Sequence, residues 1–467
     1  MRTVLLNLPS NERVFRRYMC SYNSPNSLFP PIELMALAGI AKRVKNAETL
    51  LIDAVAENID LQQVIARLRQ FNPELLVSLT GFEVFQQDME ALSALKSAFP
   101  DAKVGCFGHY PTLFPKETLK NSDIDFILLN EPDIAFSEFY DCLQKNKSYS
   151  NLKGLAFRAK NKITINAQRE RIKDLDSLPI PAHELLNLEK YSEVLMDRPF
   201  TVLQTSRGCP FACNYCVHTY GRQFAERSAE KVLEEIEFIA GLGIRSFRFF
   251  DDTFNANKRR IIDVCRGIVE RKIKMKWSCF SRVDTIDKEV FEWMKKAGCV
   301  RVLIGIESGS QRILDFYKKG YKTENLREKI KIVKDSGIES TGFFMVAPQE
   351  SEEDFKKSIE LAKSLDLDFV LVSSLIPYPG TELFEGMKKQ VEFSLFPYEN
   401  KFVDSTIDGR LIRREKEFYR AFYFRPSYAL HAIKYFASKP VESISNAFKL
   451  AAYVISKPAE KTRQDFY

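Results

Sequence analysis

Apolar and polar positions alternate along the first part of the chain in a pattern typical of parallel α/β sheets. Apolar runs predict strands at Thr3–Pro9, Thr49–Ala54, Leu75–Gly81, Ala102–Gly108 and Asp125–Glu131. The segments between them, such as residues 31–44 and 61–71, have the composition and spacing of helices. Strands that are apolar almost throughout and that alternate with helices favour a parallel sheet covered on both faces.

A ligand in such a sheet binds at the carboxyl ends of the strands. In this chain those ends are residues 9–11, 80–82, 108–112 and 130–133. We therefore expect these loops to form the binding face of a first domain, residues 1–148.

A second alternation of strands and helices fills residues 199–386. The predicted strands are Phe200–Ser206, Arg245–Asp252, Met275–Asp284, Val300–Gly309, Glu339–Pro348 and Phe369–Gly380. Several of the helices between them end at glycine, which is a common C-cap. Six β/α units in series predict a parallel barrel, or an open part of one, whose chemistry lies at the C-terminal ends of the strands.

Two segments lack this alternation. Residues 149–198 combine a predicted β-hairpin with a proline-rich stretch, and we expect them to form a connector that packs on both neighbours. Residues 387–467 form a shorter, mainly helical region. One helical stripe in it consists of Val441, Ile444, Phe448, Ala452 and Ile455.

Positive charge is concentrated at the end of the chain. The 467 residues have a net charge of +7, and residues 401–467 hold 13 Lys or Arg against 7 Asp or Glu. The rest is close to neutral, so no nucleic-acid partner is expected. The basic, aromatic tail fits three alternatives: a cap on the open barrel, a peripheral contact with a membrane surface, or a contact with nucleic acid.

The sequence predicts neither export nor membrane insertion. It has no run of about 18 apolar residues, so no transmembrane helix is expected. The N-terminus reads as a buried strand and not as a signal peptide. Nine cysteines, an odd number without an export signal, predict a cytoplasmic protein with reduced thiols.

Three of these cysteines lie close together in residues 206–221, SRGCPFACNYCVHTYG. The spacing of Cys209, Cys213 and Cys216 differs from that of zinc sites, which have four ligands, although His218 could be a fourth. Thiolates also hold iron–sulfur clusters, and three of them leave one iron of a four-iron cluster open. The alternative is three unrelated core cysteines, but the glycine, proline and asparagine among them predict a loop.

The segment CPFACNYC, after the first of six predicted barrel strands, resembles the radical SAM superfamily. The resemblance implies that Cys209, Cys213 and Cys216 bind a 4Fe–4S cluster whose open iron is chelated by S-adenosylmethionine (SAM). It also implies that SAM is cleaved to a 5′-deoxyadenosyl radical. Tyr215 matches the aromatic residue that usually precedes the third cysteine.

The same resemblance assigns SAM contacts to the ends of the next two strands. Asp251 and Asp252 stand where many relatives carry Gly-Gly-Glu, and a carboxylate there can accept hydrogen bonds from the SAM amino group. Their alternative role is capping the following helix. Arg282 suits the SAM carboxylate as a fork-shaped donor, or else forms a surface ion pair.

The fourth and fifth barrel strands complete the predicted SAM site. Glu307 would accept hydrogen bonds from the ribose hydroxyls, next to Ser308, unless it is a buried, paired carboxylate. Val346 and Gln349 replace the two glycines of the Gly-x-Pro-Gly-Glu-Thr pattern in the fifth strand, which leaves that part of the SAM site open.

The order of the domains resembles that of the cobalamin-binding radical SAM enzymes. The resemblance implies a flavodoxin- or Rossmann-like N-terminal sheet and a partial (β/α)6 TIM-type barrel. Candidate cobalamin contacts are Asn11, Thr80, Gly81, Gly108, Thr112 and Glu131. The chain has no Asp-x-His-x-x-Gly motif, so no histidine is expected below the cobalt. The alternative is a sheet that has lost cobalamin and positions a substrate.

As a whole, the resemblance implies a cobalamin-dependent enzyme that methylates an unactivated carbon of a small-molecule, lipid-like or natural-product substrate. Methylcobalamin would supply the methyl group, and a flavodoxin- or ferredoxin-type protein would donate electrons. Cyclisation, oxidation or carbon–carbon coupling without net methyl transfer is the alternative. A methylthiotransferase is disfavoured because Cys20, Cys106 and Cys142 are widely separated. A non-enzymatic iron–sulfur module is disfavoured by the complete barrel pattern.

Overall fold

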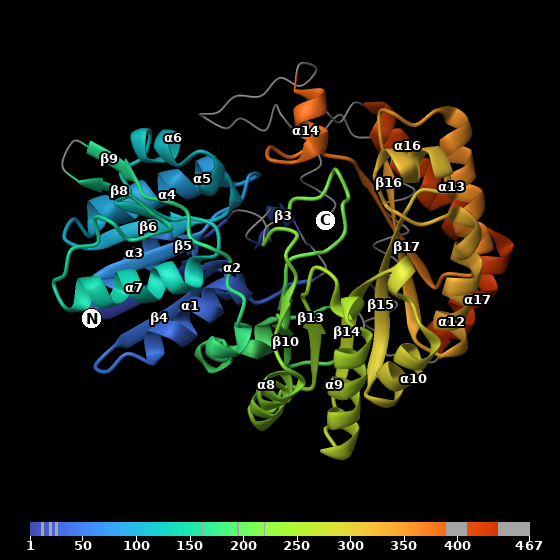
Figure 1. Ribbon diagram of the computed structural model, residues 1–467, viewed down its shortest axis with the longest axis horizontal. Coiled ribbons are helices and arrows are strands. Elements are labelled where there is room, and N and C mark those ends of the chain that lie inside the picture. Colours follow the sequence, from blue (N-terminus) through green and yellow to red (C-terminus); the bar gives the residue numbers. More distant parts are fainter. Residues whose placement is uncertain are drawn as a thin grey trace.

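Two mainly parallel sheets lie next to each other in the computed structural model (Figure 1). The structure describes residues 1–10, 14–17, 21–23, 27–159, 162–193, 196–218, 220–388 and 409–437. The predicted stripe from Val441 to Ile455 therefore lies outside the described residues, as does Asn11. Among the described helices, none is both long and apolar enough to span a bilayer.

The first sheet has the strand order of a flavodoxin-like domain. Its parallel strands are β1 (Arg2–Asn7), β4 (Glu48–Asp53), β5 (Leu75–Leu79), β6 (Lys103–Phe107) and β7 (Phe126–Leu128). They run in the order β4-β1-β5-β6-β7, which confirms the predicted parallel sheet. The next two parallel strands along the chain, β4 and β5, pair with opposite sides of β1. The strand order therefore reverses at β1, and ligands of such folds bind at the carboxyl end of the strands at this switch point.

Helices cover both faces of this sheet, as the apolar strands require. Helices α1 (Ile32–Lys42) and α7 (Pro132–Gln144) pack together, and α3 (Leu61–Phe71) and α4 (Phe85–Ala98) pack together. Short helices follow β4 and β6. They are α2 (Ala54–Glu57), α5 (His109–Leu113) and α6 (Pro115–Lys120). Helix α1 is buried almost all round because the linker crosses it at Gly39, where an added Cβ would lie 2.5 Å from the carbonyl oxygen of Ile180.

The predicted hairpin belongs to the first sheet, which corrects part of the connector prediction. Strands β8 (Leu155–Ala159) and β9 (Lys162–Ile165) extend the sheet antiparallel to β7. Pairing with β7 satisfies backbone groups that would otherwise form an open edge. The linker after it contacts both neighbours. The backbone N–H of Ala182 donates to Met35, while the His183 ring bonds to Thr201 and Glu235, each at 3.0 Å.

The second sheet is a six-stranded open barrel. Its parallel strands are β10 (Phe200–Leu203), β13 (Ser246–Phe249), β14 (Lys276–Arg282), β15 (Cys299–Glu307), β16 (Glu339–Val346) and β17 (Phe369–Ser374), in that order. The outer helices are α8 (Ala229–Gly241), α9 (Lys258–Glu270), α10 (Lys288–Lys296), α12 (Leu326–Asp335) and α13 (Glu352–Ser364). This confirms the six predicted β/α units, with β10 and β17 as the two edges.

Smaller elements complete the described fold. They are the antiparallel pairs β2 (Val14–Arg16) with β3 (Ser21–Asn23) and β11 (Ser206–Arg207) with β12 (Ala225–Glu226), the helices α11 (Gln311–Phe316), α14 (Glu382–Met387), α16 (Gly409–Tyr423) and α17 (Pro426–Ala437), and the 3₁₀ turns η1 (Leu175–Ser177), η2 (His183–Leu185), η3 (Leu188–Lys190), η4 (Phe254–Ala256), η5 (Val283–Thr285) and η6 (Thr323–Asn325). The pair β11–β12 forms the base of the cysteine loop.

The described part of the C-terminal region covers the barrel edge at β17. The Tyr419 hydroxyl accepts a hydrogen bond from the Val372 N–H (2.9 Å) and lies 3.2 Å from the carbonyl oxygen of the same residue. The Tyr423 hydroxyl does the same at Val370, at 3.0 Å in both cases. Of the three roles considered for the tail, these contacts are those of a cap on the open barrel.

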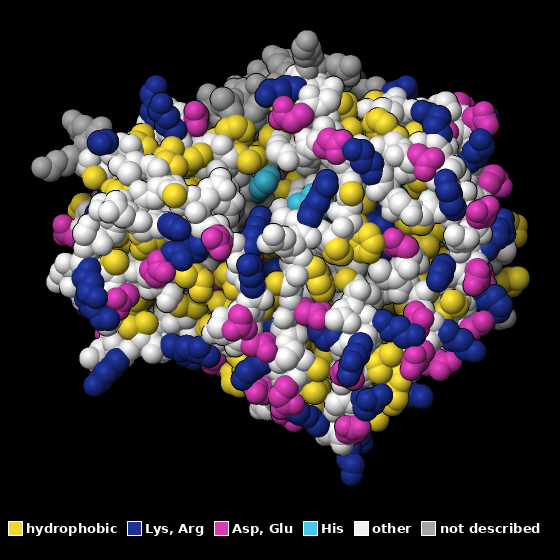
Figure 2. Space-filling view, viewed as in Figure 1, with side chains coloured by type: hydrophobic (Ala, Val, Ile, Leu, Met, Phe, Trp, Pro, Cys, Tyr) yellow, Lys and Arg dark blue, Asp and Glu magenta, His cyan; other side chains and the backbone are white. Residues whose placement is uncertain are grey.

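The carboxyl end of the first sheet faces the open barrel. His109, which follows β6, lies 3.2 Å from the carbonyl oxygen of Pro379 in the loop after β17. The Tyr378 hydroxyl of the same loop donates to Glu83, which follows β5. His and Lys or Arg side chains gather over the seam between the two domains (Figure 2). These contacts bring the strand ends of both sheets to one region of the molecule.

Candidate active site

The three clustered cysteines lie on the loop that β11 and β12 close. Gly208 makes this loop possible, because its φ is +81° and an added Cβ would lie 2.2 Å from the carbonyl oxygen of Gln223. The N–H of Cys209 donates to the Gly221 carbonyl (3.2 Å) and fixes the two arms of the loop. The loop follows the first barrel strand, on the face where barrel enzymes place their chemistry.

The thiols of this loop are free and influence one another. Cys209, Cys213 and Cys216 form no disulfides. Burial raises the pKa of the Cys209 and Cys216 thiols, and the pKa of Cys216 is raised further by Asp252 and by the two other cysteines. As separate thiols, Cys209 and Cys216 would therefore hold their protons, and a positively charged group beside them would favour the thiolates.

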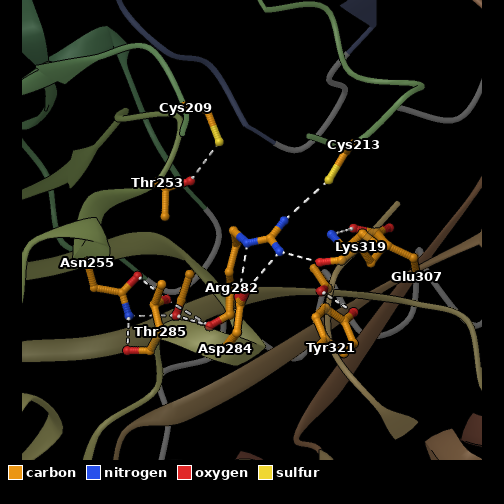
Figure 3. A network of polar contacts seen from close by, with 12 residues as sticks. Cys209, Cys213, Thr253, Asn255, Arg282, Asp284, Thr285, Glu307, Lys319 and Tyr321 are labelled. Atoms are coloured by element: carbon orange, nitrogen blue, oxygen red, sulfur yellow. Dashed lines mark hydrogen bonds and ion pairs between the residues drawn. The ribbon is translucent and has the colours of Figure 1, made fainter. Parts of the chain in front are cut away.

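Arg282 reaches the cysteine loop from the end of β14 (Figure 3). Its Nη1 donates to Cys213 Sγ at 3.3 Å, and its Nε and Nη2 donate to the two carboxylate oxygens of Asp284, each at 3.0 Å. The guanidinium carbon lies 3.7 Å from the centre of the Phe211 ring. The predicted ion pair thus joins a buried arginine to an exposed aspartate, and the arginine holds the cysteine loop.

Tyr215 and Glu307, predicted separately, meet in the structure. The Tyr215 hydroxyl donates to Glu307 Oε1 (3.1 Å), and Lys319 Nζ donates to the same oxygen (3.0 Å). Glu307 is therefore the buried, paired carboxylate that the sequence left as an alternative. Gly305 leaves room for the pair, since an added Cβ would lie 2.6 Å from Glu307 Oε1.

Lys319 was not predicted from the sequence. It is 4% exposed and lies between Glu307 and the cysteine loop, where its charge lowers the pKa of the Cys216 thiol against the larger effect of burial. In the sequence it is one of two adjacent lysines in a loop, and no spacing distinguishes it from Lys318.

The two aspartates at the end of β13 play different parts. Asp251 is 1% exposed, and its carboxylate accepts from the N–H and hydroxyl of Thr205 (both 2.5 Å) and from the N–H of Ser206 (2.9 Å). It therefore anchors the start of the cysteine loop and is turned away from any ligand. Neither aspartate caps α9, because Asn257 is its N-cap.

Asp252 is the aspartate open to the site. Its side chain is exposed to solvent, yet protein atoms surround it closely. This crowding by protein atoms and the charge of Asp251 raise the pKa of the Asp252 carboxyl to about 6, although Arg17 lowers it. The N–H of Gly208 donates to this carboxylate and links it to the cysteine loop.

The prediction for Ser308 is corrected by its surroundings. Ser308 has no exposed surface, and its hydroxyl lies 3.1 Å from the Ser358 hydroxyl on α13 and accepts from the N–H of Ser310 (3.2 Å). The residue after Glu307 turns outward because Glu307 itself has a φ of +64°. Ser308 therefore holds the loop against α13 and does not face the SAM site.

The predicted cobalamin contacts fall into two groups. Thr80 and Gly81 are buried at the end of β5, next to Gly108 at the end of β6, where an added Cβ would lie 2.0 Å from the Thr80 carbonyl oxygen. Thr112 and Glu131 are engaged elsewhere. The Thr112 hydroxyl accepts from the N–H of Asn130 (3.1 Å), and Glu131 accepts from the linker N–H of Ile172 (2.7 Å).

Comparison with known proteins agrees with this arrangement. A family model described as the radical SAM superfamily matches residues 203–362. An uncharacterized methyltransferase of Pyrococcus horikoshii is 31% identical over 388 residues, which cover 82% of each chain. The chain belongs to the radical SAM superfamily. It is thus an enzyme, and the cofactors of its family are a 4Fe–4S cluster and SAM.

Solved structures of radical SAM enzymes share the fold of both sheets. OxsB, a cobalamin-dependent radical SAM enzyme with aqua-cobalamin bound, has a TM-score of 0.67 at 19% identity, covering 86% of this chain and 56% of OxsB. The radical SAM methyltransferase TsrM from Kitasatospora setae has a TM-score of 0.66 at 17% identity, covering 83% of this chain and 76% of TsrM. At these identities the similarity concerns the fold.

The cysteine loop fits the cluster of the radical SAM superfamily better than a single metal ion. Among the described residues, no three His, Cys, Asp or Glu side chains converge as ligands of one ion. Cys209 and Cys213 are near enough to Cys216 to raise its pKa, yet the three thiols do not converge on one point, which suits a cluster in which each cysteine binds a different iron.

Proposed function

We propose that this radical SAM enzyme is a cobalamin-dependent methylase that adds a methyl group to a carbon of an apolar small molecule. The observation that carries the proposal is the position of the first sheet. Its carboxyl end, at the topological switch, faces the cysteine loop, and the contacts of His109 with Pro379 and of Tyr378 with Glu83 hold it there. Two cofactors bound at these edges would meet over one substrate.

Cys209, Cys213 and Cys216 would hold the cluster, and Asp252 would accept hydrogen bonds from the SAM amino group. When bound, the cluster and SAM would supply a radical that removes a hydrogen atom from the substrate, and cobalamin would supply the methyl group. The residues of the chain bind and orient these groups, while Asp251 and Arg282 hold the cysteine loop in place.

The end of β5 supports the cobalamin part of the proposal. Phe82 is fully buried there, and its ring lies 5.2 Å from that of Tyr110 and 5.7 Å from that of Tyr378. These buried rings pack beneath Tyr378, which is half-buried and whose ring would suit the apolar face of a large ring. No imidazole ligand to cobalt is needed for this arrangement.

The inner face of the barrel supports an apolar substrate. The ring of Phe280 on β14 lies 6.3 Å from that of Phe250, just after β13, and 6.2 Å from that of Phe343 on β16. Strands β14 and β16 are separated by β15, so rings from both can meet only on the concave face of the sheet. Phe280 and Phe343 are half-buried and are left to contact a ligand.

Anaerobic reconstitution tests this proposal. The full chain is loaded with iron, sulfide and cobalamin, desalted, and its ultraviolet–visible spectrum is recorded. We expect one cobalamin per chain to be retained, and turnover with a reductant and substrate to give S-adenosylhomocysteine and 5′-deoxyadenosine together. A protein that assembles its cluster but retains no cobalamin would contradict the proposal.

A second candidate is a reaction without net methyl transfer, such as a cyclisation. It is favoured by a relative, an anaerobic magnesium-protoporphyrin IX monomethyl ester cyclase of Cereibacter sphaeroides, which is 25% identical over 85% of this chain and 67% of its own. The same experiment separates the two functions. The cyclisation-type reaction predicts 5′-deoxyadenosine without S-adenosylhomocysteine.

A further inference from the structure

Most N–H groups of Arg282 already donate hydrogen bonds to neighbouring protein atoms. A guanidinium has five N–H groups, one on Nε and two on each Nη. Nε and Nη2 grip Asp284, and Nη2 also donates to the carbonyl oxygen of Lys319 (2.6 Å). Nη1 donates to Cys213 Sγ, and the Phe211 ring covers the flat face. One N–H of Nη1 is left for any other acceptor, so the bidentate grip on a SAM carboxylate predicted from the sequence is already taken.

The partner of Nη1 is a sulfur that becomes a thiolate when it binds iron. Arg282 is 7% exposed and its charge persists at every pH of interest, so its hydrogen bond to Cys213 is shielded from water and always charge-assisted. Hydrogen bonds to cluster sulfurs and nearby charge are the main ways in which a protein sets the reduction potential of an iron–sulfur cluster. A cation stabilises the reduced, more negative cluster and so raises its potential.

We propose that Arg282 is a positioning residue that sets the reduction potential of the cluster through Cys213, with Asp284 and Phe211 fixing its guanidinium. This inference depends on the superfamily's cluster and not on cobalamin. A chain without cobalamin leaves it intact.

Thr253 provides an internal comparison. Its hydroxyl lies 3.4 Å from Cys209 Sγ, but it also lies 2.8 Å from the carbonyl oxygen of Asp252 and donates to it. A hydroxyl has a single proton. Thr253 can therefore donate a hydrogen bond to Cys209 only if it breaks its hydrogen bond to the Asp252 carbonyl oxygen. Arg282, in contrast, donates to Cys213 while it keeps all its other hydrogen bonds.

The test is a redox titration of the full, anaerobically reconstituted chain, with the reduced cluster followed by electron paramagnetic resonance. SAM is absent from the titration, and SAM affinity is measured separately by equilibrium dialysis. Arg282→Gln is compared with Arg282→Lys and with Arg222→Gln, which removes an exposed charge from the same loop. Thr253→Val is included as the weaker neighbour.

We expect Arg282→Gln to make the cluster about tenfold harder to reduce, a shift of about 60 mV to more negative potential for one electron. Arg282→Lys should shift it less, and Arg222→Gln and Thr253→Val should leave it near the wild-type value. Unchanged potential in Arg282→Gln would overturn the proposal. If SAM affinity falls at the same time, Arg282 is a SAM ligand instead.

A second variant covers the case in which Arg282→Gln assembles no cluster. Phe211→Leu changes no charge but removes the ring that packs on the guanidinium and helps to aim it at Cys213. It should assemble the cluster at a potential between those of the wild type and a variant lacking the cation. A wild-type potential in Phe211→Leu would also contradict the proposal.

Discussion

The cysteine loop and the carboxyl end of the first sheet face each other but are built by different means. Around the cysteines, charged side chains from β14 and from the loops after β13 and α11 converge, among them Asp251, Arg282 and Lys319, each with named partners. At the sheet end, the contacts are aromatic packing and close backbone approach, as at Phe82 and Gly108. The difference teaches that one half of the site depends on particular side-chain atoms, and the other on shape.

If this contrast holds, a side-chain change at the loop should abolish its function and leave the sheet end intact. Cys213→Ser is expected to lose the cluster and SAM cleavage altogether, because a serine oxygen is a poor replacement for thiolate. Iron content and 5′-deoxyadenosine formation measure this loss, while cobalamin retention should stay at the wild-type level. Cys142→Ser, on α7 and away from the loop, is the matched control. A Cys213→Ser protein that still cleaves SAM would break the comparison.

The buried pair Lys319–Glu307 should matter for folding as well as for SAM. Lys319→Met leaves a buried carboxylate without its cation, which costs about 3–5 kcal/mol in the free energy of unfolding. Urea unfolding of the apoprotein measures it. Lys331→Met, which removes an exposed partner of Asp335 on α12, should show no measurable change.

A second substitution separates charge from packing at this pair. Lys319→Met combined with Glu307→Gln removes both charges and should recover part of the lost stability. If the double variant is no more stable than Lys319→Met alone, the lost free energy comes from packing and the ion pair is not its source.

A backbone change at the sheet end should give the smallest effect and the opposite pattern. Gly108→Ala forces a side chain onto a φ of +142° and against the Thr80 carbonyl, at a cost of about 1–3 kcal/mol. We expect weaker cobalamin retention with unchanged iron content. Gly241→Ala, at the end of α8 where an added Cβ meets nothing within 4 Å, is the control. Lost iron with retained cobalamin would reverse the comparison.

The strands and the cysteine loop could be predicted because their signals are local. Apolar runs marked the strands of both sheets, although the predicted sixth barrel strand ran past the end of β17 at Ser374 to Gly380. Three cysteines within eight residues marked the loop. The hairpin β8–β9 was assigned to the connector because its sequence does not say which edge it joins. That choice depends on β7 having a free side.

Contacts between distant residues could not be predicted in the same way. Lys319 meets Tyr215 across 104 positions of sequence, and Arg282 meets Cys213 across 69. Both depend on how neighbouring strands of the barrel bring their ends together. Ser308 shows that neighbours in sequence can also point to different places. It was predicted to lie in the SAM site because it follows Glu307 directly, but the backbone turn at Glu307 directs its side chain to α13.

The tyrosines of α16 have a consequence for how the enzyme can be shortened. A hydroxyl that hydrogen-bonds to both the N–H and the carbonyl oxygen of one β17 residue occupies the edge at which another polypeptide could pair as a strand. A chain that ends before Gly409 would leave the backbone N–H and carbonyl groups at the outer edge of β17 unpaired. Exposed sheet edges of this kind associate with one another. The helix therefore protects solubility, and an isolated barrel would be expected to aggregate even with its cysteine loop intact.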